Sequence, residues 1–388
     1  MKRYLFYPHV SAFGGIERLI EAFVREGRAV AEDWTLLTFG ETEQRPPCLP
    51  PSIPVETIPC TRGFLAERRA LRQWLKARAD DPPDQFLAFE LRAALYLSLA
   101  SPRWPYHLLI CDTPRLLKRD ISKRAFSFPL KGDSTDVGSY HLPSRLKGEL
   151  THRLIRLGVR HAASIQTNTQ SLKTEIDALY GVSSIVNYPG SAPTEETSPL
   201  PGQQNALRES VRFLSVCRLE PSKRIDLLIE AFDSAAAELK CPAILTLIGD
   251  GSERGNLETQ AASTGNPQRI RFAGFVSDEE LESAYAEADI FVMPAVQGYG
   301  LPGLESLQRG LSLIVHADSG VAEILEGSPR VKIISGSCGS LSRAMVELAN
   351  LHLDKKPLPQ HCLDLPSDET WFTKARKLLD EKAFATRD

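Results

Sequence analysis

The chain has 388 residues and a formal net charge of -3, a length that corresponds to about two or three domains. Hydrophobic residues make up 42% of the chain and charged residues 24%, which excludes a disordered chain and a low-complexity fibre. No apolar run approaches the roughly 18 residues that a membrane-spanning helix needs, and the run near Leu5 is too short for a signal peptide. Seven scattered cysteines without a C-x-x-C pair predict free thiols in a cytoplasmic protein.

The charge is unevenly divided along the chain. Residues 1–190 hold 26 Lys and Arg against 20 Asp and Glu, a net charge of +6, and residues 191–388 hold 20 against 29, a net charge of -9. A basic half joined to an acidic half predicts two domains with different partners.

Strands and helices alternate in the first half. Hydrophobic periodicity predicts strands at 4–7, 35–39, 107–111 and 163–167, a helix beginning at Ile16, and further helices at 62–78, 87–99, 146–159 and 170–180. Alternation of this kind indicates a parallel α/β sheet.

The same alternation restarts in the second half, after a stretch at 187–206 that is rich in Pro and Gly and predicts a linker. Strands are predicted at 211–216, 243–248, 270–273, 290–293 and 313–315, and helices at 225–239, from 277 and from 303. The sequence therefore predicts two α/β domains in tandem. In such domains ligands bind at the carboxyl ends of the strands.

Two strand ends in the first half carry candidate binding residues. Gly14 and Gly15 precede a helix, where backbone N–H groups can approach an anion; a tight turn is the alternative. Asp112 closes the strand at 107–111, where it orients a sugar hydroxyl or acts as a base, or else makes an Asx turn before a proline. The histidines show no metal-ligand spacing, and His9 alone lies in a loop at a predicted strand end.

Two loops in the second half also follow predicted strands. Arg218 and Lys223 can neutralise a diphosphate, or can belong to a solvated basic loop. The run Gly249-Asp250-Gly251 permits close backbone approach, but it is also a common turn.

The densest signal is the block at 297–305. Three glycines and a proline precede a helix there, so the loop is tight and points N–H groups toward a ligand. Glu305 lies in the first turns of that helix, where a carboxylate can accept hydrogen bonds from a vicinal diol such as ribose. The alternative is a surface glutamate that interacts with the helix dipole.

Taken together, the motifs resemble those of the family-4 retaining glycosyltransferases of the GT-B fold over nearly the full chain. Each motif is weak alone, but the ordered set is specific. The matching segments are residues 14–18, 112–115, 167–169, 180–181, 188–190, 217–224, 248–251, 272–277, 297–305 and 320–323.

The resemblance implies two Rossmann-like domains that face a cleft. Residues 1–190 would form the acceptor-binding domain, 191–206 a linker, 207–367 the nucleotide-sugar-binding domain, and 368–388 a helix that crosses back to the first domain. The implied donor is a UDP-sugar or a GDP-sugar, and the implied acceptor is a glycan, a lipid-linked molecule or a small molecule, as in polysaccharide biosynthesis. No cofactor, metal ion or nucleic acid is implied.

The resemblance also assigns residue roles. The implied catalytic residues are Arg218 and Lys223 at the donor diphosphate, with Asp112 and Gln297 at the sugar. The implied donor-binding residues are Gly15, Gly249, Asp250, Val276, Tyr299, Gly300, Leu301 and Glu305.

Two positions depart from the family pattern. The first Glu of the family's E-x7-E block is Gln297 here, and Asp112 replaces a histidine that often stands at its strand end. The nucleotide half of the site is therefore kept and the sugar half is altered. Besides a retaining transferase, this leaves open an enzyme for an unusual donor and a catalytically impaired GT-B protein that binds nucleotide or supports a partner. A nucleotide-sugar epimerase shares the architecture but not this motif series.

The positive charge of the first half suggests a surface for an anionic membrane. Residues 62–78 and 145–160 place cationic and apolar residues together on predicted helices, and such helices can lie on anionic lipid. A solvated basic face over an ordinary core stripe is the alternative.

Overall fold

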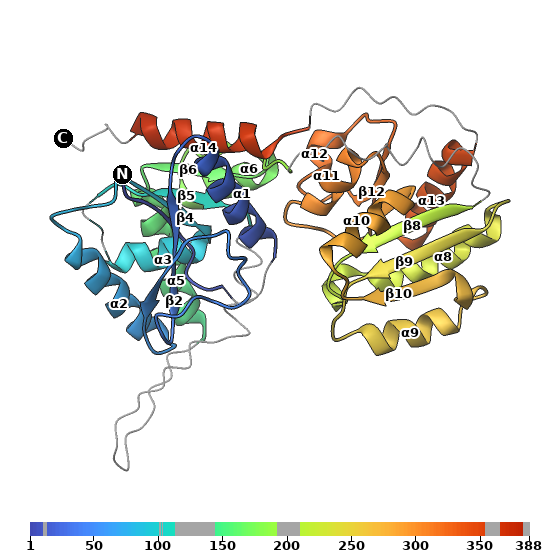
Figure 1. The fold of residues 1–388 in the computed structure, drawn as a ribbon, viewed down its shortest axis with the longest axis horizontal. Helices are drawn as coiled ribbons and strands as arrows, with labels where there is room; N and C mark the ends of the chain where they lie inside the picture. Colours follow the sequence, from blue (N-terminus) through green and yellow to red (C-terminus); the bar gives the residue numbers. More distant parts are fainter. Residues whose placement is uncertain are drawn as a thin grey trace, which may run out of the picture. The chain divides into compact units, whose positions relative to one another are not determined.

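A computed structural model describes residues 1–10, 14–100, 102, 104–112, 144–191, 210–353 and 365–382. The chain divides into an N-terminal unit, Met1–Pro189 with Asp368–Asp388, and a C-terminal unit, Gly190–Ser367. Each unit contains one parallel β-sheet with helices packed on it (Figure 1). The predicted α/β class with two doubly wound domains is therefore confirmed. Except for Ser191, the predicted linker at 191–206 lies outside the described residues.

The sheet of the N-terminal unit has the strand order β3-β2-β1-β4-β5-β6-β7. Its strands are β1 (Arg3–Phe6), β2 (Trp34–Gly40), β3 (Val55–Pro59), β4 (Gln85–Phe89), β5 (His107–Ile110), β6 (Ser164–Thr167) and β7 (Ile185–Val186). Its helices are α1 (Gly15–Ala29), α2 (Phe64–Ala77), α3 (Glu90–Ala100), α5 (Ser144–His161), α6 (Gln170–Tyr180) and α14 (Asp368–Lys382).

The start of the helix predicted at 87–99 is wrong, because Leu87–Phe89 belong to strand β4. This strand pairs with β1 on one side and β5 on the other, and the side chains of Leu87, Ala88 and Phe89 are fully buried. A strand buried on both faces has a continuous apolar run, which hydrophobic periodicity cannot distinguish from a buried helix. The helix α3 begins only at Glu90.

Helices α2, α3 and α5 share one apolar core with the sheet of the N-terminal unit. Helix α3 is apolar on most of its surface and lies in contact with both α2 and α5. Gly158 permits the closest approach, since a Cβ at this position would lie 2.0 Å from the carbonyl oxygen of Ala94.

Helix α14 packs on α1 in the same unit (Figure 1). The ring of Phe23 on α1 makes edge contacts with Trp371 and Phe372, at centroid distances of 5.6 and 4.8 Å. Asn187 donates from Nδ2 to the carbonyl oxygen of Trp371 over 3.1 Å. Helix α14 thus contributes aromatic side chains to the packing of the N-terminal unit, although it follows the C-terminal unit in sequence.

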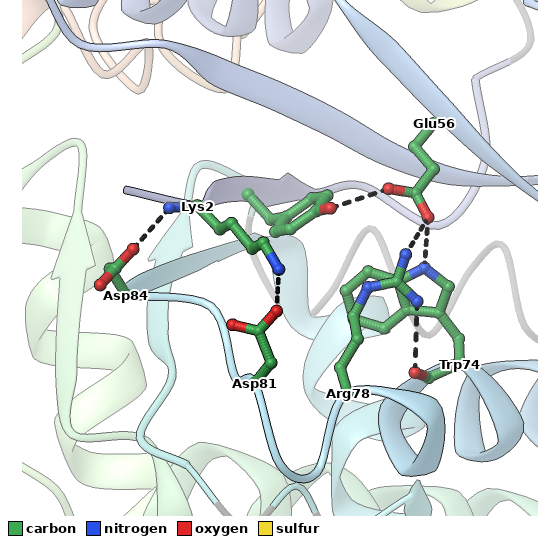
Figure 2. Close-up of polar contacts among 7 residues, drawn as sticks. Lys2, Glu56, Trp74, Arg78, Asp81 and Asp84 are labelled. Atoms are coloured by element: carbon green, nitrogen blue, oxygen red, sulfur yellow. Dashed lines mark hydrogen bonds and ion pairs between the residues drawn. The ribbon is translucent and has the colours of Figure 1, made fainter.

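A polar network holds the C-terminal end of α2 to the sheet (Figure 2). The carboxylate of Glu56 accepts hydrogen bonds from Trp74 Nε1 over 2.6 Å, Arg78 Nη2 over 2.7 Å and the hydroxyl of Tyr4 over 2.8 Å. The Arg78 guanidinium also lies 4.0 Å from the centroid of the Trp74 ring. The network fixes which face of α2 meets the core and which faces outward.

The sheet of the C-terminal unit has the strand order β10-β9-β8-β11-β12-β13. Its strands are β8 (Val211–Val216), β9 (Ala243–Ile248), β10 (Ile270–Gly274), β11 (Ile290–Met293), β12 (Ser312–His316) and β13 (Val331–Ile334). Its helices are α8 (Ile225–Glu238), α9 (Arg254–Ala262), α10 (Asp278–Glu287), α11 (Leu301–Gln308), α12 (Ala322–Leu325) and α13 (Cys338–Leu353), with short 3-10 turns η2 (Pro221–Lys223) and η3 (Pro267–Arg269).

Both sheets reverse their strand order at one point. In the N-terminal unit the reversal lies between β1 and β4, and in the C-terminal unit it lies between β8 and β11. Ligands of doubly wound sheets bind where the order reverses, beyond the carboxyl ends of these strands. The loops after these four strands are therefore where the fold favours a ligand site.

Candidate functional site

Backbone packing fixes the loop that carries Arg218. The N–H of Leu219 donates to the carbonyl oxygen of Asp250 over 2.9 Å, so the loops after β8 and β9 run against each other. Gly249 makes this possible: its φ is +124°, and a Cβ there would lie 1.9 Å from the carbonyl oxygen of Cys217. Only glycine fits, since both the conformation and the space exclude a side chain.

The structure brings Lys223 and Gln297 together across the strand-order reversal of the C-terminal unit. Lys223 ends the turn η2 after β8, and its Nζ donates to Oε1 of Gln297, after β11, over 2.6 Å. The side chain of Arg218 is 72% exposed and forms an ion pair with Glu220 at 2.8 Å. Two cations thus follow β8, at the strand-order reversal where doubly wound sheets generally bind ligands.

The block at 297–305 is held by the turn at Ser319–Val321. The N–H of Gln297 donates to Ser319 Oγ over 3.1 Å, and the N–H of Val321 donates to the carbonyl oxygen of Tyr299 over 2.8 Å. The side chain of Tyr299 is buried, and the donor-binding role that the resemblance implies for this residue stays a prediction.

Gly300 is the N-cap residue of helix α11 and has the left-handed conformation, with φ +115°. The predicted start at Gly303 is two residues late, because Pro302 fits the first turn of a helix and the helix begins at Leu301. Leu301 is buried and Glu305 is half-buried in the second turn. The N-terminus of α11 follows the loop that carries Gln297, as the sequence predicts.

The two remaining candidates of this unit lie after β9 and β10. The carboxylate of Asp250 accepts hydrogen bonds from the N–H of Gly251 over 2.7 Å and from Arg254 Nη1 over 2.9 Å, and these two donors, in that order, lower its pKa. Val276 is half-buried beside Phe275, whose side chain is 91% exposed. The donor-binding residues that the family resemblance implies include Val276 and not Phe275, although an exposed aromatic ring in a strand-end loop can stack on a flat ligand.

Helix α1 of the N-terminal unit begins at Gly15, which is exposed and has open space around it. The N–H of Gly14 already donates to the buried carboxylate of Glu17 over 3.0 Å. A negative side chain therefore occupies the start of α1, and the anion-binding role predicted for Gly15 stays a prediction.

At the end of β5, Asp112 lies beside a buried carboxyl group that the sequence analysis missed. Glu90, the first residue of α3, accepts hydrogen bonds from the N–H groups of Cys111 over 2.8 Å and Asp112 over 3.4 Å. Burial and, next, the charge of Asp112 raise the pKa of Glu90 well above its ordinary value. Residues 113–115 of the predicted motif lie outside the described residues.

His9 follows β1 and contacts a second buried glutamate. Its Nε2 lies 3.0 Å from Oε1 of Glu67, which also accepts from the N–H of Gly63 over 3.3 Å; the other carboxylate oxygen accepts from the hydroxyl of Tyr96. Burial raises the pKa of Glu67, but the hydrogen bonds with His9, Tyr96 and the Gly63 N–H, together with the electrostatic attraction of His9, outweigh burial and bring that pKa below its ordinary value.

Other kinds of site find little support in the part of the chain that the structure describes. Within it, no three His, Cys, Asp or Glu side chains are arranged to hold a metal ion, and its six cysteines are free thiols. None of the helices described is both long and apolar enough to cross a membrane.

The fold is that of the GT-B glycosyltransferases. Anabaena HepE in complex with UDP and glucose matches with a TM-score of 0.69 and 18% identity, over 98% of this chain and all of that chain. WaaG, a glycosyltransferase involved in lipopolysaccharide biosynthesis, matches with a TM-score of 0.68 and 17% identity, over 97% of this chain and 99% of that chain.

Sequence comparison points to the same class of protein. Residues 200–344 match the family model described as glycosyl transferases group 1. A GDP-mannose-dependent alpha-(1-6)-phosphatidylinositol monomannoside mannosyltransferase of Mycobacterium tuberculosis is 25% identical over 198 residues, which are 47% of this chain and 51% of that protein. The amylovoran biosynthesis glycosyltransferase AmsK of Erwinia amylovora is 29% identical over 130 residues, 32% of each chain. The chain thus spans about half the length, or less, of these curated relatives.

Proposed function

We propose that the protein transfers a sugar from a UDP-sugar or a GDP-sugar to a glycan or a lipid-linked acceptor. The observation that supports this most directly is the pair Lys223 and Gln297, at the strand-order reversal of the unit that matches the glycosyl transferases group 1 model. The relatives named for GDP-mannose make this donor the first to test.

In the proposed reaction the bond between the sugar C1 and the diphosphate oxygen breaks, and a bond from C1 to the acceptor hydroxyl oxygen forms. Arg218 and Lys223 stabilise the charge that develops on the leaving diphosphate. Gln297 holds the Lys223 ammonium in place through a hydrogen bond and places no negative charge beside it.

The resemblance to the retaining family supports transfer with retention of configuration and without a metal ion. The leaving phosphate oxygen accepts the proton of the acceptor hydroxyl, so the enzyme supplies no nucleophile. Glu305, in the second turn of α11, is proposed to hold the ribose, and the backbone at Val276 to meet the base.

Replacement of both cations tests the proposal. In the Arg218→Ala, Lys223→Ala variant, we expect kcat to fall by about 100-fold to 1,000-fold, the loss typical of a charge-stabilising group. Lys240→Ala, an exposed lysine after α8, is the matched control and should leave transfer unchanged. Unchanged donor turnover in the double variant would refute the role of the cations. Nucleotide binding without turnover over a panel of donors would instead favour a catalytically impaired protein.

We also propose that the N-terminal unit contacts anionic membrane through α2 and α5. On α2, Leu65 is 49% exposed and is followed at helical spacing by the exposed Arg69, Arg72 and Lys76. On α5, Leu150 and Leu157 are 55% and 41% exposed on the face that carries Arg153 and Arg160. Apolar residues among cations are the composition of a helix that lies on lipid.

Vesicle sedimentation tests this contact. The Leu150→Ser, Leu157→Ser variant should bind phosphatidylserine-containing vesicles several-fold more weakly than the wild type, since each exposed leucine adds apolar area. Val30→Ser removes an equally exposed apolar side chain from the end of α1 and serves as the control. Absence of binding by the wild type at low salt would refute the membrane contact and favour a soluble acceptor.

A further inference from the structure

Side chains hold the chain just after strand β5, whose backbone pairing with β6 ends at Ile110. Glu90 follows β4 and Asn168 follows β6, and these two strands flank β5 in the sheet. Asn168 donates from Nδ2 to the carbonyl oxygen of Cys111 over 3.0 Å. Glu90 accepts from the N–H of Asp112 and from the N–H of Cys111.

Two of these hydrogen bonds belong to one peptide group. The carbonyl oxygen of Cys111 and the N–H of Asp112 lie at opposite ends of the same planar unit. Asn168 holds one end and Glu90 holds the other, so rotation of this peptide group is restrained from both sides. The backbone that carries Asp112 is thereby fixed at its start.

The backbone conformation of Glu90 is costly. Its φ is +74°, in the left-handed region that a residue with a Cβ avoids. Such strain persists where the surrounding structure enforces it, and it gathers at functional sites. A neutral side chain could accept hydrogen bonds from the same two N–H groups without the cost of burying a carboxyl group. The fold of the sheet therefore does not by itself explain why a glutamate stands at this strained position.

The charged and titratable groups around Glu90 come from several elements. Asp112 and the Cys111 thiol, both after β5, act on Glu90 directly. Glu90 acts in turn on Tyr7, after β1, together with Glu17 on α1 and Arg92 on α3. Burial, and then the charges of Glu17, Glu90 and Asp112, raise the pKa of the Tyr7 hydroxyl. Glu90 is therefore set into a group of polar side chains at the strand-order reversal of the N-terminal unit.

We propose that Glu90 and Asn168 are positioning residues that clamp the peptide group before Asp112 and so aim Asp112 at the reacting sugar. This inference rests on the proposed glycosyl transfer, in which Asp112 is a site residue. The clamp acts through Asp112 and touches no substrate.

Three variants test the clamp. Glu90→Gly removes the carboxyl group at a position whose φ suits glycine, so the chain should fold; Glu90→Gln keeps one acceptor oxygen; Asn168→Ala removes the other side of the clamp. Tyr106→Phe is the control, because it removes a buried hydrogen bond to the Gly158 carbonyl at the opposite end of β5.

We expect Glu90→Gly and Asn168→Ala to lower kcat by about tenfold or more with little change in donor KM, as misaligned groups do. Glu90→Gln should recover part of the loss, and Tyr106→Phe should show none. In the background of Asp112→Asn, Glu90→Gly should add less than about twofold, since the two act as one unit. Additive losses, or a kcat no lower than in Tyr106→Phe, would overturn the positioning role.

Amide hydrogen exchange separates failure of the clamp from failure of the proposed function. The amides of Cys111 and Asp112 should exchange faster in Glu90→Gly and not in Tyr106→Phe. A wild type without turnover on any donor would refute the proposed function and with it the catalytic part of this inference. Unchanged exchange at both amides would refute the clamp itself.

Discussion

The two units have the same strand order around their reversal points, yet they place opposite chemistry there. In the C-terminal unit, Lys223 donates to the neutral Gln297, and Arg218 is largely exposed beside them. In the N-terminal unit, the carboxyl group of Glu90 is buried beside Asp112 on a strained backbone. The strand order determines where a site can form in each unit. The side chains in the loops after the strands determine its chemistry, which is cationic in the C-terminal unit and carboxylic in the N-terminal unit.

The largest expected effect concerns the close contact of Gly249 with the backbone of Cys217, which holds together the loops after β8 and β9. Gly249→Ala should destabilise the protein by about 3 kcal/mol, since the Cβ clashes with Cys217 and the backbone is strained. Gly255→Ala, in α9 with open space around it, should instead gain up to about 1 kcal/mol. Urea unfolding measures both. Equal midpoints for the two variants would show that the loop after β8 does not depend on this contact.

Next in size, two buried glutamates of the N-terminal unit should give opposite dependence of stability on pH. The pKa of Glu67 is lowered in the folded state, so its contribution is present above the unfolded pKa and is lost as pH falls through the folded pKa. The Tm deficit of Glu67→Gln relative to the wild type should therefore shrink on acidification.

Glu90 should behave in the reverse way. Its pKa is raised in the folded state, so its contribution is complete below the unfolded pKa and is lost as pH rises through the folded pKa. The Tm of Glu90→Gln should gain on that of the wild type as pH rises from 4 toward 8. If the Tm difference from the wild type changed with pH in the same direction for both variants, the two carboxyl groups would not have oppositely shifted pKa values.

A smaller effect should follow loss of the contact across the reversal in the C-terminal unit. Gln297→Ala removes one hydrogen bond from the charged Lys223 ammonium, worth about 1.5 kcal/mol, so kcat/KM should fall by about tenfold. Gln260→Ala removes a hydrogen bond of 2.9 Å to the backbone of Asp226 and should leave transfer unchanged. Equal rates in both variants would show that Gln297 does not orient the cation.

The smallest expected effect concerns a strained backbone position to which no function is assigned. Ala31, an exposed residue after α1, also has a positive φ, +60°. Ala31→Gly should stabilise the protein by up to about 1 kcal/mol in urea unfolding and leave transfer unchanged. A loss of transfer in this variant would show that positive φ in this unit does not distinguish a positioning residue from an ordinary turn.

Sequence periodicity predicted the α/β class and most strands, because amphipathic helices and short apolar runs bounded by turns carry strong local signals. It missed β3 and β13, whose short runs mix apolar and charged residues, and the two-residue strand β7, and it assigned the end of β4 to a helix. Strands buried on both faces lose the alternation that periodicity needs.

In the candidate site, too, the sequence indicated some residues, whereas other residues and contacts are seen only in the fold. Motif order pointed to Lys223 and Gln297 separately, but only the fold shows the hydrogen bond between residues 74 positions apart. Glu90 gave no signal, since its role depends on a backbone conformation and on amides from β5 that spacing along the chain cannot reveal. Local chemistry can be read in order along a chain, whereas long-range hydrogen bonds depend on the fold.

The return of α14 to the N-terminal unit has a consequence for biosynthesis. The N-terminal unit lacks Trp371 and Phe372 until the whole C-terminal unit has been translated, so the part of the Phe23 ring that these two side chains contact stays exposed until then. The C-terminal unit, continuous in sequence, can fold first. A nascent chain stalled before residue 368 should therefore bind a chaperone that recognises apolar surface, and release should follow when α14 emerges.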